Sequence, residues 1–133
     1  MDEREFKQRT KKLALRVIRL VESLPRTHAS EVIGKQLLRS ATSVGANYRA
    51  ACRGKSTADV ISKLGIVEEE SDESIYWMEL LVEAGLVPEA KLASLMTEMN
   101  EIVAMTVASI KTLRAHSSGA SDTKRIQNLK SKI

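Results

Sequence analysis

Cys52 is the residue whose chemical reactivity its neighbours could raise. It is the single cysteine of the chain, and Arg49, Arg53 and Lys55 lie within three residues of it. Nearby positive charge lowers the pKa of a thiol and makes it nucleophilic. A cysteine nucleophile also needs a base, and the local sequence contains no histidine. We therefore expect Cys52 to be a buried or half-buried structural residue.

Two further chemical patterns, a phosphate-binding loop and a metal site, are incomplete. The segment Arg53-Gly54-Lys55-Ser56 resembles the end of a phosphate-binding loop, but Arg49 stands where that loop needs its first glycine. A di-metal bundle needs Glu-x-x-His pairs, and neither His28 nor His116 follows a glutamate at that step. We predict no catalytic residue, no cofactor and no metal site, and hence a protein that is not an enzyme.

Charge is distributed unevenly along the sequence. Residues 25–55 carry six positive groups and one negative group, whereas residues 56–86 carry one positive group and eight negative ones. Arginine suits phosphate because its planar guanidinium donates paired hydrogen bonds. The predicted nucleic-acid-binding residues are Arg39, Arg49, Arg53 and Lys55, with an auxiliary set in the basic tail at Lys124, Arg125, Lys130 and Lys132. Alternatively, the acidic segment pairs with the basic segments within one bundle or between subunits.

Apolar periodicity and helix breakers predict the elements that carry these residues. Recurrence at three- and four-residue steps indicates helices over 3–24, 29–52, 58–84 and from Pro88 to about 115. The short connections force neighbouring helices to be antiparallel, so we predict an all-α, up-down-up-down four-helix bundle over residues 1–115. Residues 116–133 lack apolar periodicity and are predicted to form a flexible linker and basic tail.

The third helix has two features that a simple bundle does not require. The predicted core-facing stripe is Ile61, Leu64, Ile75, Met78 and Val82, and Tyr76, Trp77, Leu80 and Leu81 add apolar area on neighbouring faces. We interpret Trp77 and Leu80 as an oligomer interface, although a wide core stripe would also explain them. The run 68–73 is entirely polar and covers every face of a helix. Its inward-facing members need partners, because an unpaired buried charge is costly. At least one of Glu68, Ser71 and Asp72 is predicted to face inward. The predicted partners of Glu68 and Asp72, as structural polar residues, are Arg39 and Asn47.

The sequence also bears on where the protein is found. Its first residues, Met1–Glu5, are charged where a secretory signal would be apolar. On the fourth helix the longest uncharged apolar run, Ile102–Ile110, is far shorter than the ~20 residues that span a bilayer. We expect a cytoplasmic protein with no membrane partner.

Two segments carry a resemblance to a known family. Ser40–Tyr48 (SATSVGANY) and Lys63–Leu81 (KLGIVEEESDESIYWMELL), joined through the basic turn Arg53–Ser56, resemble the bacterial four-helix-bundle family named after proteins encoded in 23S rRNA intervening sequences. The resemblance covers most of Phe6–Leu113. It implies a small antiparallel bundle, often a homopentameric ring, with no known catalytic activity. A related branch comprises the accessory variability proteins of diversity-generating retroelements, which are basic pentamers that bind nucleic acid and a reverse transcriptase.

The sequence departs from that family at the end of the second helix. Many relatives have Asn-x-Ala-Glu-Gly after the serine segment, whereas this chain has Asn47-Tyr48-Arg49-Ala50-Ala51. Arginine makes the helix end more basic and favours an anionic partner. The leading hypothesis is a non-enzymatic oligomer, a pentamer by resemblance, that binds structured RNA or DNA. The alternative is a protein-interaction scaffold or reverse-transcriptase accessory subunit whose charges mainly serve subunit pairing.

Overall fold

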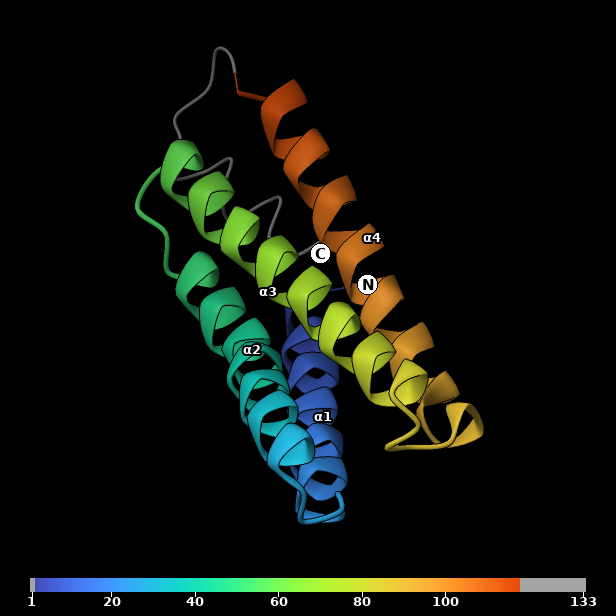
Figure 1. The fold of residues 1–133 in the computed structure, drawn as a ribbon. Coiled ribbons are helices and arrows are strands. Elements are labelled where there is room, and N and C mark those ends of the chain that lie inside the picture. Colours follow the sequence, from blue (N-terminus) through green and yellow to red (C-terminus); the bar gives the residue numbers. More distant parts are fainter. Residues whose placement is uncertain (1, 118–133) are drawn as a thin grey trace.

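The computed structural model describes residues 2–117, which form an antiparallel bundle of four α-helices (Figure 1). The helices are α1 (Glu3–Glu22), α2 (His28–Cys52), α3 (Thr57–Glu83) and α4 (Glu89–Ala115). α2 packs against α1 and α3, and α3 also packs against α4. α1 and α3 therefore lie at diagonal corners of the bundle. The predicted up-down-up-down architecture is confirmed.

Local sequence explains where the helices begin. Asp2, Thr27 and Ser56 each precede a helix, and each side chain accepts a hydrogen bond from the backbone N–H three residues later, at 2.8–3.2 Å. These caps satisfy N–H groups that have no partner inside the helix. After α3, Gly85 adopts a positive φ of 73°, a conformation that glycine takes without strain and that ends the helix.

The first helix ends two residues earlier than the sequence predicts. α1 stops at Glu22, where the hydroxyl of Ser23 donates to the carbonyl of Leu20 at 2.7 Å. The N–H of Leu24 then bonds the carbonyl of Val21, which closes a tighter turn before Pro25. The helix therefore ends two residues before Leu24, the residue whose helical angles Pro25 disfavours.

The core seam of α3 is rotated relative to the prediction. Leu81, assigned to a neighbouring face from the sequence, is fully buried, whereas Ile61, Ile75 and Val82 are only half-buried. Two serines within the polar and acidic stretch account for the difference. Ser71 and Ser74 are fully buried and continue the inward seam, whose members are Val60, Leu64, Val67, Ser71, Ser74, Met78 and Leu81.

Small side chains bring α2 close to both of its neighbours. Toward α3, the hydroxyls of Ser40 and Ser74 are hydrogen-bonded to each other at 2.8 Å in the buried core. Toward α1, a Cβ atom at Gly45 would lie only 3.2 Å from the hydroxyl oxygen of Thr10. A larger side chain at Gly45 would push α1 and α2 apart.

Long polar side chains bridge α1 and α4, which approach closely over only a short stretch. Arg9 donates to the carboxylate of Glu98 through Nε at 2.9 Å and through a terminal nitrogen at 2.5 Å, and to Glu101 at 3.1 Å. These hydrogen bonds hold the pKa of the Glu98 carboxyl below its ordinary value. The ion pair therefore helps to hold α1 and α4 together, whereas close side-chain packing holds the other pairs of neighbouring helices together.

The predicted tail begins just after α4. From residue 118 onward the linker and the four basic tail residues lie outside the described part of the chain. Over residues 2–117, no helix combines the length and the apolar character that crossing a membrane requires.

Candidate nucleic-acid interface

A groove of about 320 Å³ runs between the outer surfaces of α1 and α2. Lys7 and Lys11 of α1 and Arg49 of α2 line it, together with small and polar residues. The complete lining is Lys7, Gln8, Thr10, Lys11, Ala14, Thr42, Gly45, Ala46 and Arg49. The groove thus combines three basic side chains with a lining that has little side-chain bulk.

Helical spacing places these three basic groups together. Lys7 and Lys11 are four residues apart and share one face of α1. Arg49 is four residues after Gly45, whose close contact with Thr10 sets the level of α2 against α1. Because the helices are antiparallel, Arg49 lies across from the first half of α1.

Sequence reasoning missed Lys7 and Lys11 as candidate binding residues. The signal was present in their four-residue spacing and in the positive charge of the first helical segment. The sequence does not reveal the register between α1 and α2. Without it, the residues that face each other across the groove cannot be identified.

The side chain of Arg49 is exposed and forms no hydrogen bond or ion pair with another described residue. Lys7 has one such partner, Glu3, at 3.4 Å on the same helix. A solvated pair of this kind contributes little free energy, so an incoming anion can displace it. The groove can therefore offer its cations to phosphate oxygens without breaking a buried ion pair.

Two more predicted residues continue this basic surface beyond the groove. Arg53 is the residue that ends α2, is exposed, and follows Arg49 by one helical turn. Lys55 is exposed in the connector to α3, where its backbone N–H donates to the carboxylate of Asp59 at 3.1 Å. Arg49 and Arg53 therefore share one side of α2, with Lys55 in the turn that follows.

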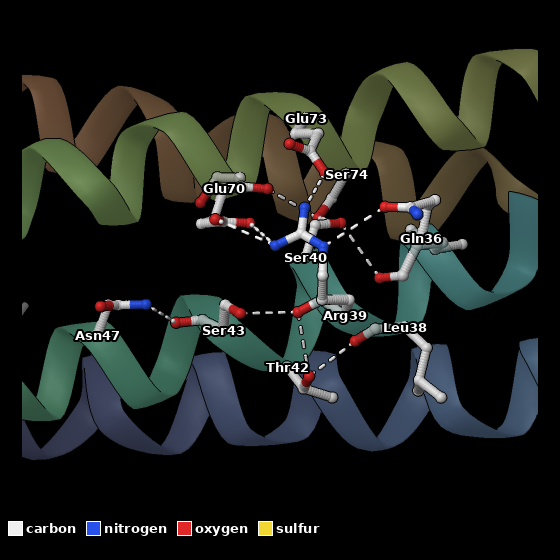
Figure 2. A network of polar contacts seen from close by, with 12 residues as sticks. Gln36, Leu38, Arg39, Ser40, Thr42, Ser43, Asn47, Glu70, Glu73 and Ser74 are labelled. Carbon is white, nitrogen blue, oxygen red and sulfur yellow. Dashed lines mark hydrogen bonds and ion pairs between the residues drawn. The ribbon is translucent and has the colours of Figure 1, made fainter.

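Arg39 is the predicted residue that the structure does not bring to this surface (Figure 2). Its guanidinium points toward α3, where it donates to both oxygens of Glu70 at 3.2–3.3 Å and to Glu73. It is ten residues before Arg49, about 15 Å along the helix at ~1.5 Å per residue. Binding of phosphate by Arg39 stays a prediction. A phosphate would have to compete with the carboxylates of Glu70 and Glu73 for the guanidinium of Arg39.

The predicted partners of the polar run were wrong. Arg39 pairs with Glu70 and Glu73 rather than with Glu68 or Asp72. A step of one or two residues rotates a side chain by about 100–200° around a helix, which moves it away from α2. Figure 2 shows the amide of Asn47 donating to the carbonyl of Ser43 at 2.8 Å, within its own helix. Within the run, the small hydroxyl of Ser71 occupies the core position, so no carboxylate needs to be buried there.

Trp77 and Leu80, the predicted oligomer interface, are both half-buried. The indole nitrogen of Trp77 donates to Glu73 at 3.0 Å, and its ring meets that of Tyr76 edge-on at 5.1 Å. Trp77 therefore belongs in part to the same network as Arg39. A role for Trp77 and Leu80 in self-association stays a prediction.

Cys52 is half-buried, as the sequence analysis expected. Burial raises the pKa of its thiol to about 11, with a further contribution from the carboxylate of Glu3. The thiol is therefore protonated at neutral pH despite the nearby arginines. Within residues 2–117, no three His, Cys, Asp or Glu side chains are grouped so that they could hold a metal ion.

Comparison with known proteins identified a family and a similar solved structure. Residues 2–108, which include α1, α2, α3 and most of α4, match the family model described as 23S rRNA-intervening sequence protein. The fold matches the crystal structure of a protein with unknown function from the S23 ribosomal protein family of Bacteroides thetaiotaomicron. That match has a TM-score of 0.78 and 34% sequence identity and covers 84% of this chain and 99% of the other. A search of curated proteins found no match.

Proposed function

The chain belongs to the family of 23S rRNA-intervening sequence proteins, and from that premise we propose that it is a non-enzymatic, homo-oligomeric bundle that binds structured RNA or DNA. The observation that carries the proposal is the basic groove between α1 and α2, lined by Lys7, Lys11 and Arg49. The family name refers to a genomic location and does not identify the ligand. We place the protein in the cytoplasm, in line with its single cysteine, which cannot form a disulfide within the chain.

The groove suits a phosphate backbone better than it suits bases. Its cations extend from Lys7 and Lys11 to Arg49 and on to Arg53 at the end of α2. Phosphate contacts of this kind release counterions and supply affinity independent of sequence. Ala14 and Ala46, whose side chains are small, also line the groove and let a phosphate backbone approach the helices.

Aromatic side chains, which stack on unpaired bases, lie away from the groove. Phe6 and Tyr48 are buried and pack on each other, with ring centres 4.4 Å apart. Tyr76 and Trp77 are on α3, at the corner diagonal to α1. Recognition by the shape and charge of a structured nucleic acid therefore fits this surface better than recognition of single-stranded bases.

The test is binding to a labelled RNA hairpin and a labelled DNA duplex across a salt series. For the wild-type protein, the logarithm of the association constant falls linearly with the logarithm of the salt concentration. Arg49→Gln/Arg53→Gln removes two contacts and lowers the magnitude of the slope on duplex DNA by about 2. Adding Lys7→Glu to these two changes weakens binding further, because repulsion replaces attraction in the groove.

A matched control removes two charges at the other end of the bundle. Arg26 lies in the turn before α2 and Lys91 at the start of α4, and both are exposed. Arg26→Gln/Lys91→Gln keeps the salt slope of the wild type. An unchanged slope for Arg49→Gln/Arg53→Gln, in protein with normal helix content, would contradict the proposal.

A second candidate function is a protein-interaction scaffold, such as an accessory subunit of a reverse transcriptase. It is favoured by the arginines already paired inside the bundle, namely Arg9 with Glu98 and Arg39 with Glu70. If the remaining basic groups pair in the same way between subunits, little positive potential is left for nucleic acid. An assembled protein that binds neither RNA nor DNA at low salt would favour this function.

A further inference from the structure

The outward faces of α1 and α3 lie at diagonal corners of the bundle and carry opposite charge. The α1 face also exposes two large apolar side chains, and the α3 face exposes one. The two faces are therefore complementary to each other, but they cannot meet within one molecule because α2 and α4 separate them.

The α1 face is basic with an apolar centre. Leu15 is 46% exposed and Ile18 is 39% exposed, and both project from the side of α1 opposite its buried stripe. Arg4, Lys11 and Arg19 are exposed on the same side and form no ion pair with another described residue, and the stripe also carries one exposed carboxylate, Glu22. We define Arg4, Lys11, Leu15, Ile18 and Arg19 as the α1 face.

The α3 face is acidic with an aromatic centre. Tyr76 is 54% exposed, more than any other large apolar side chain among the described residues. Helical spacing places Glu69, Asp72, Glu79 and Glu83 on the same outward stripe. All four are exposed, and none forms an ion pair with another described residue. We define these five residues as the α3 face.

Contacts in the core show that the apolar centres of the two faces lie at one level. Gly45 meets Thr10 across the antiparallel α1–α2 contact. Moving five residues along each helix in opposite directions places Leu15 level with Ser40.

The same level continues across the bundle to α3. Ser40 is hydrogen-bonded to Ser74. Tyr76 is two residues farther along α3, about 3 Å along the axis at ~1.5 Å per residue. Leu15 and Tyr76 are therefore at nearly the same height on opposite corners.

We propose that the α1 face of one copy docks on the α3 face of the next, so that Tyr76 packs against Leu15 and Ile18 while the acidic residues meet Arg19 and Lys11. Such a contact joins different surfaces of two identical chains and is repeated around an assembly. Because both faces lie at one level, neighbouring copies stand side by side without a step along the axis. The proposal rests on the homo-oligomeric part of the proposed function and names its interface.

The occupant is a second copy because the chain itself carries both halves of the contact. Apolar groups flanked by unpaired cations on one face are matched by an aromatic flanked by unpaired carboxylates on the other. Complementary charge of this kind directs one surface to the other and disfavours contacts between like faces.

The test uses two variants that are each changed on one face. Leu15→Glu/Arg19→Glu places two carboxylates at the centre of the α1 face, and Tyr76→Lys/Glu79→Lys places two lysines at the centre of the α3 face. Each variant alone then places like charges in the contact and assembles on the order of 100-fold more weakly than wild type. An equimolar mixture restores association, because each altered face meets an oppositely charged face of the other variant. Mass is measured by light scattering at a fixed concentration.

A control makes the same chemical change on a third surface. Val32 is 50% exposed on α2, outside both faces, and Lys35 lies beside it. Val32→Glu/Lys35→Glu leaves the assembled mass unchanged. The proposal is overturned by a monomeric wild type, by a Leu15→Glu/Arg19→Glu variant that remains assembled, or by a mixture that does not associate. None of these variants changes Arg49 or Arg53. If the interface proposal fails, the salt dependence of nucleic-acid binding still tests the proposed function independently.

Discussion

Replacing Arg9 with methionine is expected to destabilise the bundle by about 1–3 kcal/mol, because it removes the charged bridge between α1 and α4. Arg9 makes two hydrogen bonds to one carboxylate, at 2.9 and 2.5 Å, and a third to Glu101 at 3.1 Å. Methionine keeps much of the aliphatic packing, so the change isolates the polar interactions.

The magnitude follows from geometry and partial burial. The side chains of Arg9 and Glu98 are 27% and 23% exposed, which places this pair between a solvated and a buried ion pair. Hydrogen bonds to charged groups contribute about 1.5–3 kcal/mol, and exposed pairs about 0–1 kcal/mol. Combining Arg9→Met with Glu98→Gln should give a coupling energy of about 1–2 kcal/mol in a double-mutant cycle.

The assay is urea unfolding at several pH values and one fixed protein concentration, since assembly would also stabilise the fold. Arg9 lowers the pKa of Glu98 in the folded state. The unfolded carboxyl titrates near pH 4.3, so this stabilisation is fully present above about pH 5. It is lost as the pH falls through the lower, folded-state pKa. The difference between wild type and Arg9→Met should therefore shrink in acid.

Lys7→Met provides the comparison, because it breaks an exposed pair with Glu3 at 3.4 Å, one turn away on the same helix. We expect a loss of about 0.3–0.5 kcal/mol. The reasoning is refuted if Arg9→Met costs no more than Lys7→Met, or if its cost is the same at pH 3 as at pH 7.

Three further predictions concern individual residues. The thiol of Cys52, with a pKa of about 11, should react with a disulfide reagent at a rate that rises about tenfold per pH unit between pH 7 and 10; a plateau near pH 8 would contradict its burial. Gly85→Ala should cost about 1–2 kcal/mol in urea unfolding, because alanine at a φ of 73° is strained; no loss would refute the turn geometry. Ser40→Ala and Ser74→Ala should each cost about 1 kcal/mol, and the double variant less than their sum, because both remove one hydrogen bond; additive losses would exclude that bond.

Much of the fold could be predicted because its signals are local. Thr27 and Ser56 are capping residues, Gly85 ends a helix, and short connections require antiparallel neighbours. The inward face of α3 was harder to predict, since apolar periodicity is interrupted where Ser71 and Ser74 enter the core. Small buried serines fit the close α2–α3 contact. The sequence left Ser71 as one of three possible inward residues of the polar run and gave no signal for Ser74.

The candidate site was predictable only in part. Arg49 and Arg53 share one side of a helix because of their spacing, which sequence alone shows. Lys7 lines the same groove through contacts between helices, and the pairing of Arg39 with Glu70 rather than Glu68 depends on the relative rotation of α2 and α3. Neither of these can be read from one helix.

The sequence by itself determined the helical class, the helix limits to within about two residues and the division into basic and acidic segments, because propensity, caps and charge act over a few neighbouring positions. Tertiary structure decided which charges neutralise one another and which remain exposed. Register and rotation between packed helices are set by contacts such as Gly45 with Thr10 and Ser40 with Ser74, which join residues 34 or 35 positions apart. Those contacts leave Arg49 free of a partner among the described residues, pair Arg39 with carboxylates, and place Leu15 and Tyr76 at the same height on opposite corners.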